Sequence, residues 1–103
     1  MSMKPGAKAV TVTTGTTSTA VPAGENVRLC GWSVRETSGA AFTVTFRDGN
    51  PTSGSIVGKA VAGAGSSASF FADEFGVRCP NGIGVQVTAG TCEVTVYYRD
   101  GDN

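Results

Sequence analysis

Hydrophobic and polar residues alternate along most of this chain, and a period of two predicts β-strands. The clearest case runs from 41 to 47, where Phe42, Val44 and Phe46 share one face, and two threonines and Arg47 occupy the other. Turn residues separate the alternating stretches at intervals of about ten residues, which is typical of a β-sandwich or barrel. The pattern predicts about eight short strands, with a loop at 15–19 and strands at 9–14, 20–21, 27–36, 41–47, 54–62, 68–71, 82–88 and 91–99.

The stretch from 27 to 36 is central to this prediction because it holds the only tryptophan. Strict alternation places Trp32 and Val34 on one face, with Leu29 and Gly31 on the other. We expect Trp32 to point inward, since burying a ring of that size is worth more than burying anything opposite it. The predicted core consists of Trp32, Phe42, Val44, Phe46, Val85, Val87, Val94 and Val96.

The predicted fold is all-β, a single antiparallel β-sandwich of jelly-roll or immunoglobulin-like type with an extended N-terminal arm. Residues 1–12 form the arm and residues 13–103 form the sandwich domain. The last two strands predict a hairpin that turns at Ala89 and Gly90. No stretch of useful length has the spacing of an amphipathic helix.

Composition supports strands and argues against two classes of partner. Leucine occurs once and isoleucine twice, whereas valine and threonine are frequent, which favours strand over helix. Eight basic and eight acidic residues cancel, and no polybasic tract is present, so we expect no nucleic-acid partner. No apolar run approaches the ~20 residues of a membrane helix, so we expect no membrane partner. Lys4 and Lys8 precede no apolar core, so the N-terminus does not resemble a secretory signal.

The cysteine count favours free thiols. Cys30, Cys79 and Cys92 cannot all pair within one chain, and their spacing fits no zinc site. An odd count without an export signal favours buried, reduced cysteines in a reducing compartment. The alternative is one Cys79–Cys92 disulfide, although the expected hairpin would set Cys92 opposite Val87.

The reactive side chains of the sequence predict no enzyme, no cofactor and no metal site. The chain has no histidine to act as a general base. Asp73 and Glu74 are neighbours in one turn, whereas paired catalytic carboxylates face each other across a cleft. Some aromatic residues could form a stacking platform for sugars or bases instead of packing in the core. They are Trp32, Phe70, Phe71, Tyr97 and Tyr98.

The low charge content points to an assembly. Only 16% of the residues are charged and the net charge is zero, against the roughly 25% charged residues typical of soluble proteins. Such a surface gives poor protection against association. A sandwich also has edge strands that must be covered or blunted. We infer that much of the surface is covered by other subunits.

The run from Arg28 to Gly39 reads RLCGWSVRETSG and is similar to a segment of the form LRGWSxRETxG. Further matching segments follow in order at Phe42–Gly49, Gly54–Val61, Ala68–Phe71, Gly76–Val77, Gly82–Val87 and Val94–Tyr98. Together they resemble small β-sandwich virion proteins of tailed phages that infect actinobacteria, over residues 27–98. Cys30 departs from this pattern, which has a basic residue there.

The resemblance implies a capsid decoration (cement) protein, a virion structural protein that binds the outer surface of the icosahedral head and stabilises it. Its partners would be the major capsid protein and further copies of itself, in a homotrimer or other symmetric cluster. It would be made in the host cytoplasm and reside on the capsid exterior. The resemblance brings no catalytic or cofactor-binding residues.

Two alternatives remain: another virion structural protein, such as a head fibre base or minor tail protein, and a carbohydrate- or cell-surface-binding module. For the decoration protein, we expect the N-terminal arm to reach across a subunit boundary, adding a strand to a neighbour's edge. The expected capsid or subunit interface consists of Lys4, Pro5, Lys8, Val10 and Val12.

Overall fold

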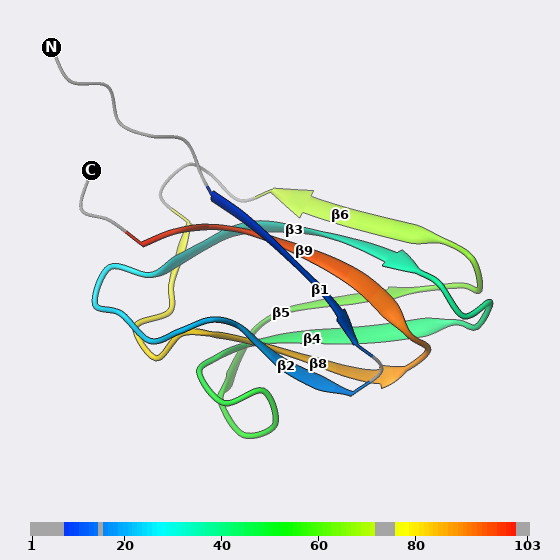
Figure 1. The fold of residues 1–103 in the computed structure, drawn as a ribbon, viewed down its shortest axis with the longest axis horizontal. Coiled ribbons are helices and arrows are strands. Elements are labelled where there is room, and N and C mark those ends of the chain that lie inside the picture. The colour runs from blue at the N-terminus through cyan, green and yellow to red at the C-terminus, as the bar shows by residue number, and fades with distance from the viewer. Residues whose placement is uncertain (1–7, 15, 72–75, 101–103) are drawn as a thin grey trace, which may run out of the picture.

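The computed structural model describes residues 8–14, 16–71 and 76–100. These residues form two antiparallel β-sheets that pack face to face, with no helix among them (Figure 1). The predicted all-β sandwich is therefore confirmed. The strands are β1 (Lys8–Thr14), β2 (Thr17–Val21), β3 (Arg28–Glu36), β4 (Phe42–Asp48), β5 (Ser55–Ala62), β6 (Ser67–Phe71), β7 (Val77–Arg78), β8 (Ile83–Ala89) and β9 (Cys92–Arg99).

The strand order is that of a jelly roll. Sheet A has the order β1-β9-β3-β6, with β7 also paired to β3, and sheet B has the order β2-β8-β4-β5. The pairing is nested: β1 pairs with β9, β2 with β8, β3 with β6 and β7, and β4 with β5. Two further pairings, β3 with β9 and β4 with β8, complete the sheets. This strand order decides between the jelly-roll and immunoglobulin-like topologies that the sequence allowed.

Apolar side chains from the facing surfaces of the two sheets fill the space between them. Every residue predicted for the core is buried. Trp32 lies among them and stacks on Phe46, with ring centroids 4.4 Å apart. Burying a large apolar side chain contributes about 1.5–3 kcal/mol relative to leaving it exposed. The apolar alternation of the sequence is thus the feature that holds the sheets together.

The last two strands do not form the predicted hairpin, because β8 lies in sheet B and β9 in sheet A. Val85 and Val87 on β8, and Val94 and Val96 on β9, are all buried. The chain crosses between the sheets at Gly90, whose φ of 76° favours glycine. The two apolar faces then meet across the core. A hairpin and a crossing connection share the same alternation, so the pattern could not separate them.

Two strands differ from the prediction. Residues 17–19, predicted as a loop, belong to β2, where Thr17 is the register partner of Gln86. Threonine is β-branched and suits a half-buried pleated surface, and alternate residues of β2 are partly or fully covered. The short strand β7 was not predicted and pairs with β3 at the edge of sheet A.

The expected N-terminal arm overlaps the sandwich. Residues 8–12 lie in β1, which pairs with β9 along its whole length. Val10 and Val12 pack against the core. Burial of their side chains explains why this segment joins the sheet of its own chain. The sandwich therefore begins by residue 8 and not at residue 13.

A β-bulge changes which residues of β3 face the core. The register with β9 shifts between Leu29 and Gly31, so Leu29 and Trp32 are both buried in the core. Strict alternation placed Leu29 on the opposite face, and that prediction is wrong. A second irregularity lies in sheet B, where the register of β4 with β5 shifts directly after Phe46, the partner of Gly58.

Candidate interaction surfaces

The residues expected at an interface have different environments. Lys8 is exposed on β1, and its ammonium donates a hydrogen bond to the Asp100 carboxylate at 2.7 Å. This hydrogen bond, together with the charge of Asp100, raises the pKa of Lys8. Val10 and Val12 are partly buried against the core of their own chain. They are therefore already partnered within the sandwich. Two expected interface residues lie outside the described residues, Lys4 and Pro5.

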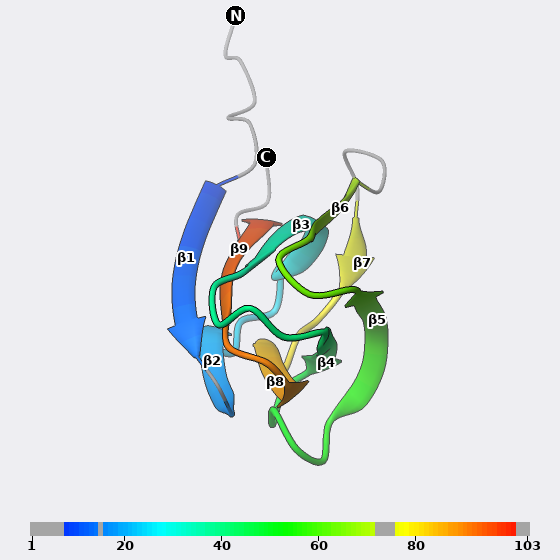
Figure 2. The same ribbon diagram turned by 90° about the vertical axis from the view of Figure 1, so that its right-hand side faces the viewer.

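The sandwich has two open sides, each formed by edge strands of both sheets (Figure 2). β1 and β2 form one side, and β5 forms the other with β6 and β7. Among the described residues, the large apolar side chains that are exposed all lie on these last three strands, a surface that we name the β5–β6 side. They are Ile56 (58% exposed), Val61 (65%), Phe70 (49%), Phe71 (65%) and Val77 (42%).

The β6 part of the sheet A edge on the β5–β6 side carries no charge, whereas Arg78 lies on β7 along the same edge. β6 has the sequence SASFF, and among the described strands it pairs only with β3. Free main-chain N–H and C=O groups on such an edge are a template for pairing with another chain. Natural edges are usually protected by lysine, proline or a bulge, and β6 has none of these. The edge of sheet B beside it carries the exposed Lys59 on β5.

An aromatic pair lies on the outer face of sheet A next to this side. Phe71 on β6 and Tyr97 on β9 are both register partners of Gly31 on β3. Their ring centroids are 5.0 Å apart and their planes are inclined by 35°. A Cβ at Gly31 would lie 2.9 Å from Cδ1 of Phe71 and 2.4 Å from the carbonyl oxygen of Phe70. The absence of a side chain at Gly31 thus allows two rings from non-adjacent strands to meet.

Trp32 reaches the same side from the inside of the sandwich. Its ring centroid lies 4.9 Å from that of Phe70, with an interplanar angle of 33°. Phe70 is 49% exposed, so it connects the buried aromatic stack to the surface. Because Trp32 is the only tryptophan, its fluorescence reports on events at the β5–β6 side.

The Glu36 carboxylate joins two turns. One oxygen accepts hydrogen bonds from the amides of Gly39 (2.6 Å) and Ala40 (2.9 Å). The other accepts from the amides of Ser38 (2.7 Å) and Thr91 (3.3 Å) and from the Ser38 hydroxyl. These bonds, with the Ser38 hydroxyl contributing most, lower the pKa of Glu36 to about 2. Glu36 is therefore a structural anion that ties the β3–β4 turn to the β8–β9 connection.

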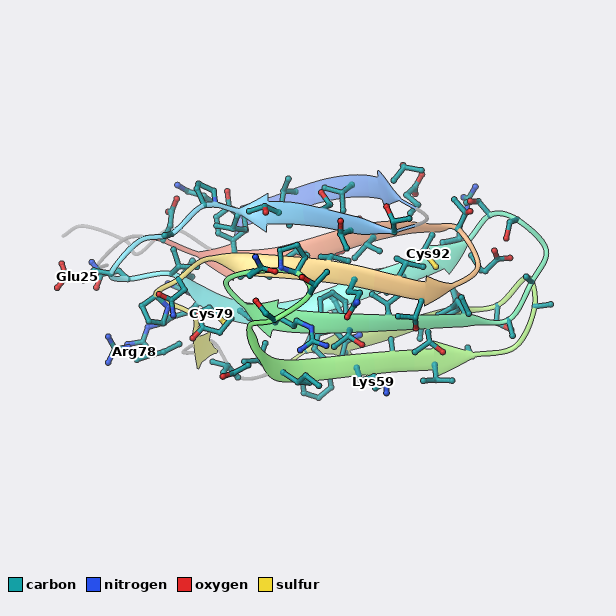
Figure 3. All side chains as sticks on the ribbon, turned by 90° about the horizontal axis from the view of Figure 1, so that it is seen from below. Glu25, Lys59, Arg78, Cys79 and Cys92 are labelled. Carbon is teal, nitrogen blue, oxygen red and sulfur yellow. The ribbon has the colours of Figure 1, made fainter. Side chains whose placement is uncertain are left out.

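The three cysteines are buried, as expected, and none of them forms a disulfide. Burial, with a smaller contribution from the charge of Asp48, raises the pKa of Cys79 to about 11. Burial and the charge of Glu36 raise the pKa of Cys92. With these raised pKa values, both thiols stay protonated near neutral pH. A thiol must lose its proton to act as a nucleophile or metal ligand, so neither thiol is set up for these roles. Cys79 and Cys92 lie towards opposite ends of the sandwich (Figure 3), too far apart for the alternative disulfide.

Other expected chemistry can be placed only in part. Within the described ranges, no group of His, Cys, Asp and Glu side chains is arranged to hold a metal ion. No helix in those ranges has the length and apolar character needed to cross a membrane. Asp73 and Glu74, considered above as a carboxylate pair, lie outside the described residues. The features that the structure does define are surfaces: the β5–β6 side and the aromatic pair beside it.

Sequence reasoning did not predict the β5–β6 side. One signal was available in Phe70 and Phe71, because two consecutive strand residues cannot both face the core. Ile56 and Val61 gave no such signal. Their exposure follows from the position of β5 at the edge of sheet B, and the period of one strand does not encode its place in a sheet.

The sequence matches no family model and no curated protein. Among solved structures, the fold is similar to that of a chain from Bacillus endospore appendages, described as a family of disulfide-linked pili. The two chains are 19% identical, the match covers 92% of this chain and 88% of the other, and the TM-score is 0.44. A likeness at this level carries no argument about function.

Proposed function

We propose that the protein is a structural component of a phage virion that decorates the outer surface of the icosahedral head and stabilises it. The observation that carries the proposal is the β5–β6 side, where five large apolar side chains are exposed beside an uncharged edge strand. Contiguous exposed apolar surface marks interaction sites, and an unprotected edge invites pairing. A protein that works alone would be expected to blunt both features.

The resemblance over residues 27–98 supplies the virion part of the proposal. Jelly rolls occur in viral capsid proteins and also in lectins, so the fold permits this role without deciding it. In the proposed assembly, the β5–β6 side contacts the major capsid protein and further copies of the chain, in a homotrimer or other symmetric cluster. Weak contacts repeated around a symmetry axis would hold the protein by avidity.

A binding assay with phage heads that lack the protein tests the proposal. Wild-type protein should sediment with the heads and raise their melting temperature in calorimetry. V61K and F71K each place a charge on the β5–β6 side and should weaken binding by about tenfold or more, because a buried unpaired charge is costly. T19K changes an exposed residue of β2 on the other side and should bind like wild type. Wild-type protein that does not bind the heads would contradict the proposal, and unchanged binding of both V61K and F71K would contradict the role of the β5–β6 side in it.

Electron microscopy of particles with and without the protein tests where it resides. Extra density on the outer face of the head is the expected result. Density confined to a fibre or to the tail would instead establish the alternative of a head fibre base or minor tail protein, and the head-decoration proposal would be wrong.

The aromatic pair on sheet A favours a second candidate, a carbohydrate- or cell-surface-binding module. Phe71 is 65% exposed and its ring meets that of Tyr97, which gives a π-surface on which a sugar ring can stack. Wild-type protein should then bind host-wall glycans, and Y97A should lose that binding. If wild-type protein binds no glycan, this candidate is wrong.

A further inference from the structure

Three arginines form a row across sheet A. Arg28 of β3 is the register partner of Arg99 on β9 and of Arg78 on β7. The adjacent Leu29 and Cys79 are buried, so alternation turns the arginine side chains to the outer face of the sheet. Neighbouring strands lie about 4.8 Å apart, so the row spans roughly 10 Å. We name these three residues the arginine row.

Two charges of the arginine row, those of Arg78 and Arg99, have no ion-pair partner within the described part of the chain. The ion pair found there joins Lys8 to Asp100 and includes neither Arg78 nor Arg99. The Nε atom of Arg99 is buried and has no hydrogen-bond partner. Arg28 does have an interaction partner, so the inference rests on the two arginines that flank it.

This row lowers the stability of the folded chain. Like charges opposite each other on adjacent strands repel, and a buried donor without a partner loses its hydration without compensation. The other two arginines have different neighbours. Arg35 lies opposite Glu93 on the same sheet, and Arg47 donates hydrogen bonds to Gln86 and to the carbonyl of Gly54. The exception at the arginine row points to an anion supplied by another molecule.

The surroundings favour carboxylates carried by a polypeptide. A guanidinium binds a carboxylate through two parallel hydrogen bonds. Tyr97 lies on the same face as Arg99, two residues before it, and Val77 beside Arg78 is 42% exposed. A polypeptide can present acidic and apolar groups to such a surface together. Figure 3 shows Arg78 extending from the end of the sandwich where Glu25 also lies. A nucleic acid would need a wider basic surface than this chain of zero net charge provides.

We propose that the arginine row binds an acidic segment of a partner protein, with Arg78 and Arg99 each holding a side-chain carboxylate. The inference goes beyond head decoration and does not depend on it. If the proposed function holds, the segment belongs to the surface that the protein decorates, and the row then sets the orientation of the sandwich on that surface.

Fluorescence anisotropy with a labelled oligoglutamate peptide tests the inference on the full chain. Wild-type protein should bind the peptide, and added salt should weaken the binding. R78Q and R99Q should each reduce the affinity by about tenfold or more. R99K keeps the charge but loses the forked donors and should give an intermediate loss. R35Q, on the same face of the same sheet, is the matched control and should bind like wild type.

Two further measurements keep the test decisive. R99Q should unfold in urea at the wild-type concentration or higher, because it removes an unpartnered buried donor; a purely structural arginine would instead lose stability. Single-stranded DNA and polygalacturonate serve as competing anions. The inference is wrong if R78Q and R99Q bind the peptide like wild type, or if either competitor binds at least as tightly as the peptide. Head binding that survives R78Q and R99Q would overturn the row's role in docking while leaving the proposed function intact.

Discussion

The indole of Trp32 fills the space that a side chain at position 58 would need. A Cβ at Gly58 would lie 2.6 Å from both Cη2 and Cζ3 of Trp32. G58A should therefore push the indole off its stack with Phe46 and destabilise the fold by about 1–3 kcal/mol. Urea denaturation followed by Trp32 fluorescence measures this. G63A is the control, since a Cβ there meets nothing closer than 3.8 Å; equal stability of G58A and G63A would contradict the packing described.

Glu36 makes stability depend on pH in the acid range. Its pKa of about 2 in the folded chain lies below the ordinary value of 4.5. A lowered pKa means that the folded state favours the charged form, so this contribution is complete above about pH 4.5 and is lost as the pH falls towards 2. Urea midpoints measured across that window should fall for the wild-type protein.

The variant E36Q isolates the effect of this carboxylate. E36Q should be less stable than wild type at neutral pH, because the amide presents hydrogens to amides that themselves donate. It should also lose less stability on acidification. E25Q, in an exposed turn, is the matched control and should keep the wild-type profile. If the urea midpoints of E36Q fell with decreasing pH as much as those of wild type, Glu36 would not be the cause of the pH dependence.

At the residue scale, the size of a side chain predicted its burial, whereas the residues of a turn did not predict their hydrogen bonds. Trp32 could be placed in the core because no other residue of its strand would gain as much from burial. The role of Glu36 could not be predicted, since its amide donors come from position 38 onward and from Thr91, which is 55 residues away. Nor could alternation reveal that the bulge in β3 turns Leu29 inward.

At the scale of elements, β1 can be separated from the segment that precedes it. Removing residues 1–7 should leave the sandwich folded, because β1 begins at Lys8. Removing residues 1–12 deletes most of β1, loses the packing of Val10 and Val12, and exposes the edge of β9. We expect that deletion to cost about 2 kcal/mol or more, measured by urea denaturation.

The same two deletions test the expected interface. Head binding that is lost on removal of residues 1–7 would assign it to the segment containing Lys4 and Pro5. A chain lacking residues 1–12 that proved as stable as the full chain would contradict the place of β1 in the sandwich.

The positions of the strands could be predicted from the sequence, but their partners could not. Alternation located the segments around Phe42, Val85 and Val94 because each must bury one face. Two consecutive strands show the same alternation when they form a hairpin and when they face each other across the core. β8 and β9 face each other across the core. The candidate surface depends on sheet order, so it became visible only once β5 and β6 were seen to be edges.

At the scale of the whole molecule, charged and apolar side chains are distributed unevenly over the outer surface, and composition alone does not reveal this. Net charge is zero, yet three arginines lie side by side on one face of sheet A and exposed apolar groups gather on the β5–β6 side. Both features lower the stability or solubility of a lone chain. An assembly in which other molecules cover them accounts for both together.

The nested topology also makes a prediction about folding. Among the described strands, β4 and β5 are the only consecutive pair that hydrogen-bond to each other, whereas the β1–β9 pairing joins Thr11 to Thr95, 84 residues apart. Closing long loops costs entropy before distant contacts form. The β4–β5 hairpin should therefore form early and β1 should dock late, with overall refolding on a millisecond-to-second timescale.

Stopped-flow refolding with Trp32 fluorescence tests this order through two variants. N50A removes the side-chain oxygen of Asn50, which accepts hydrogen bonds from the amide (2.8 Å) and the hydroxyl (2.7 Å) of Thr52 in the β4–β5 turn. This variant should mainly slow folding. V10A trims a side chain of β1 and should mainly speed unfolding. Each substitution should lower the free energy of unfolding by more than ~0.6 kcal/mol, because smaller changes cannot be divided reliably between the folding and unfolding rates. If V10A slowed folding as much as N50A for equal loss of stability, the edge strand would already be docked in the transition state, and the proposed order would be wrong.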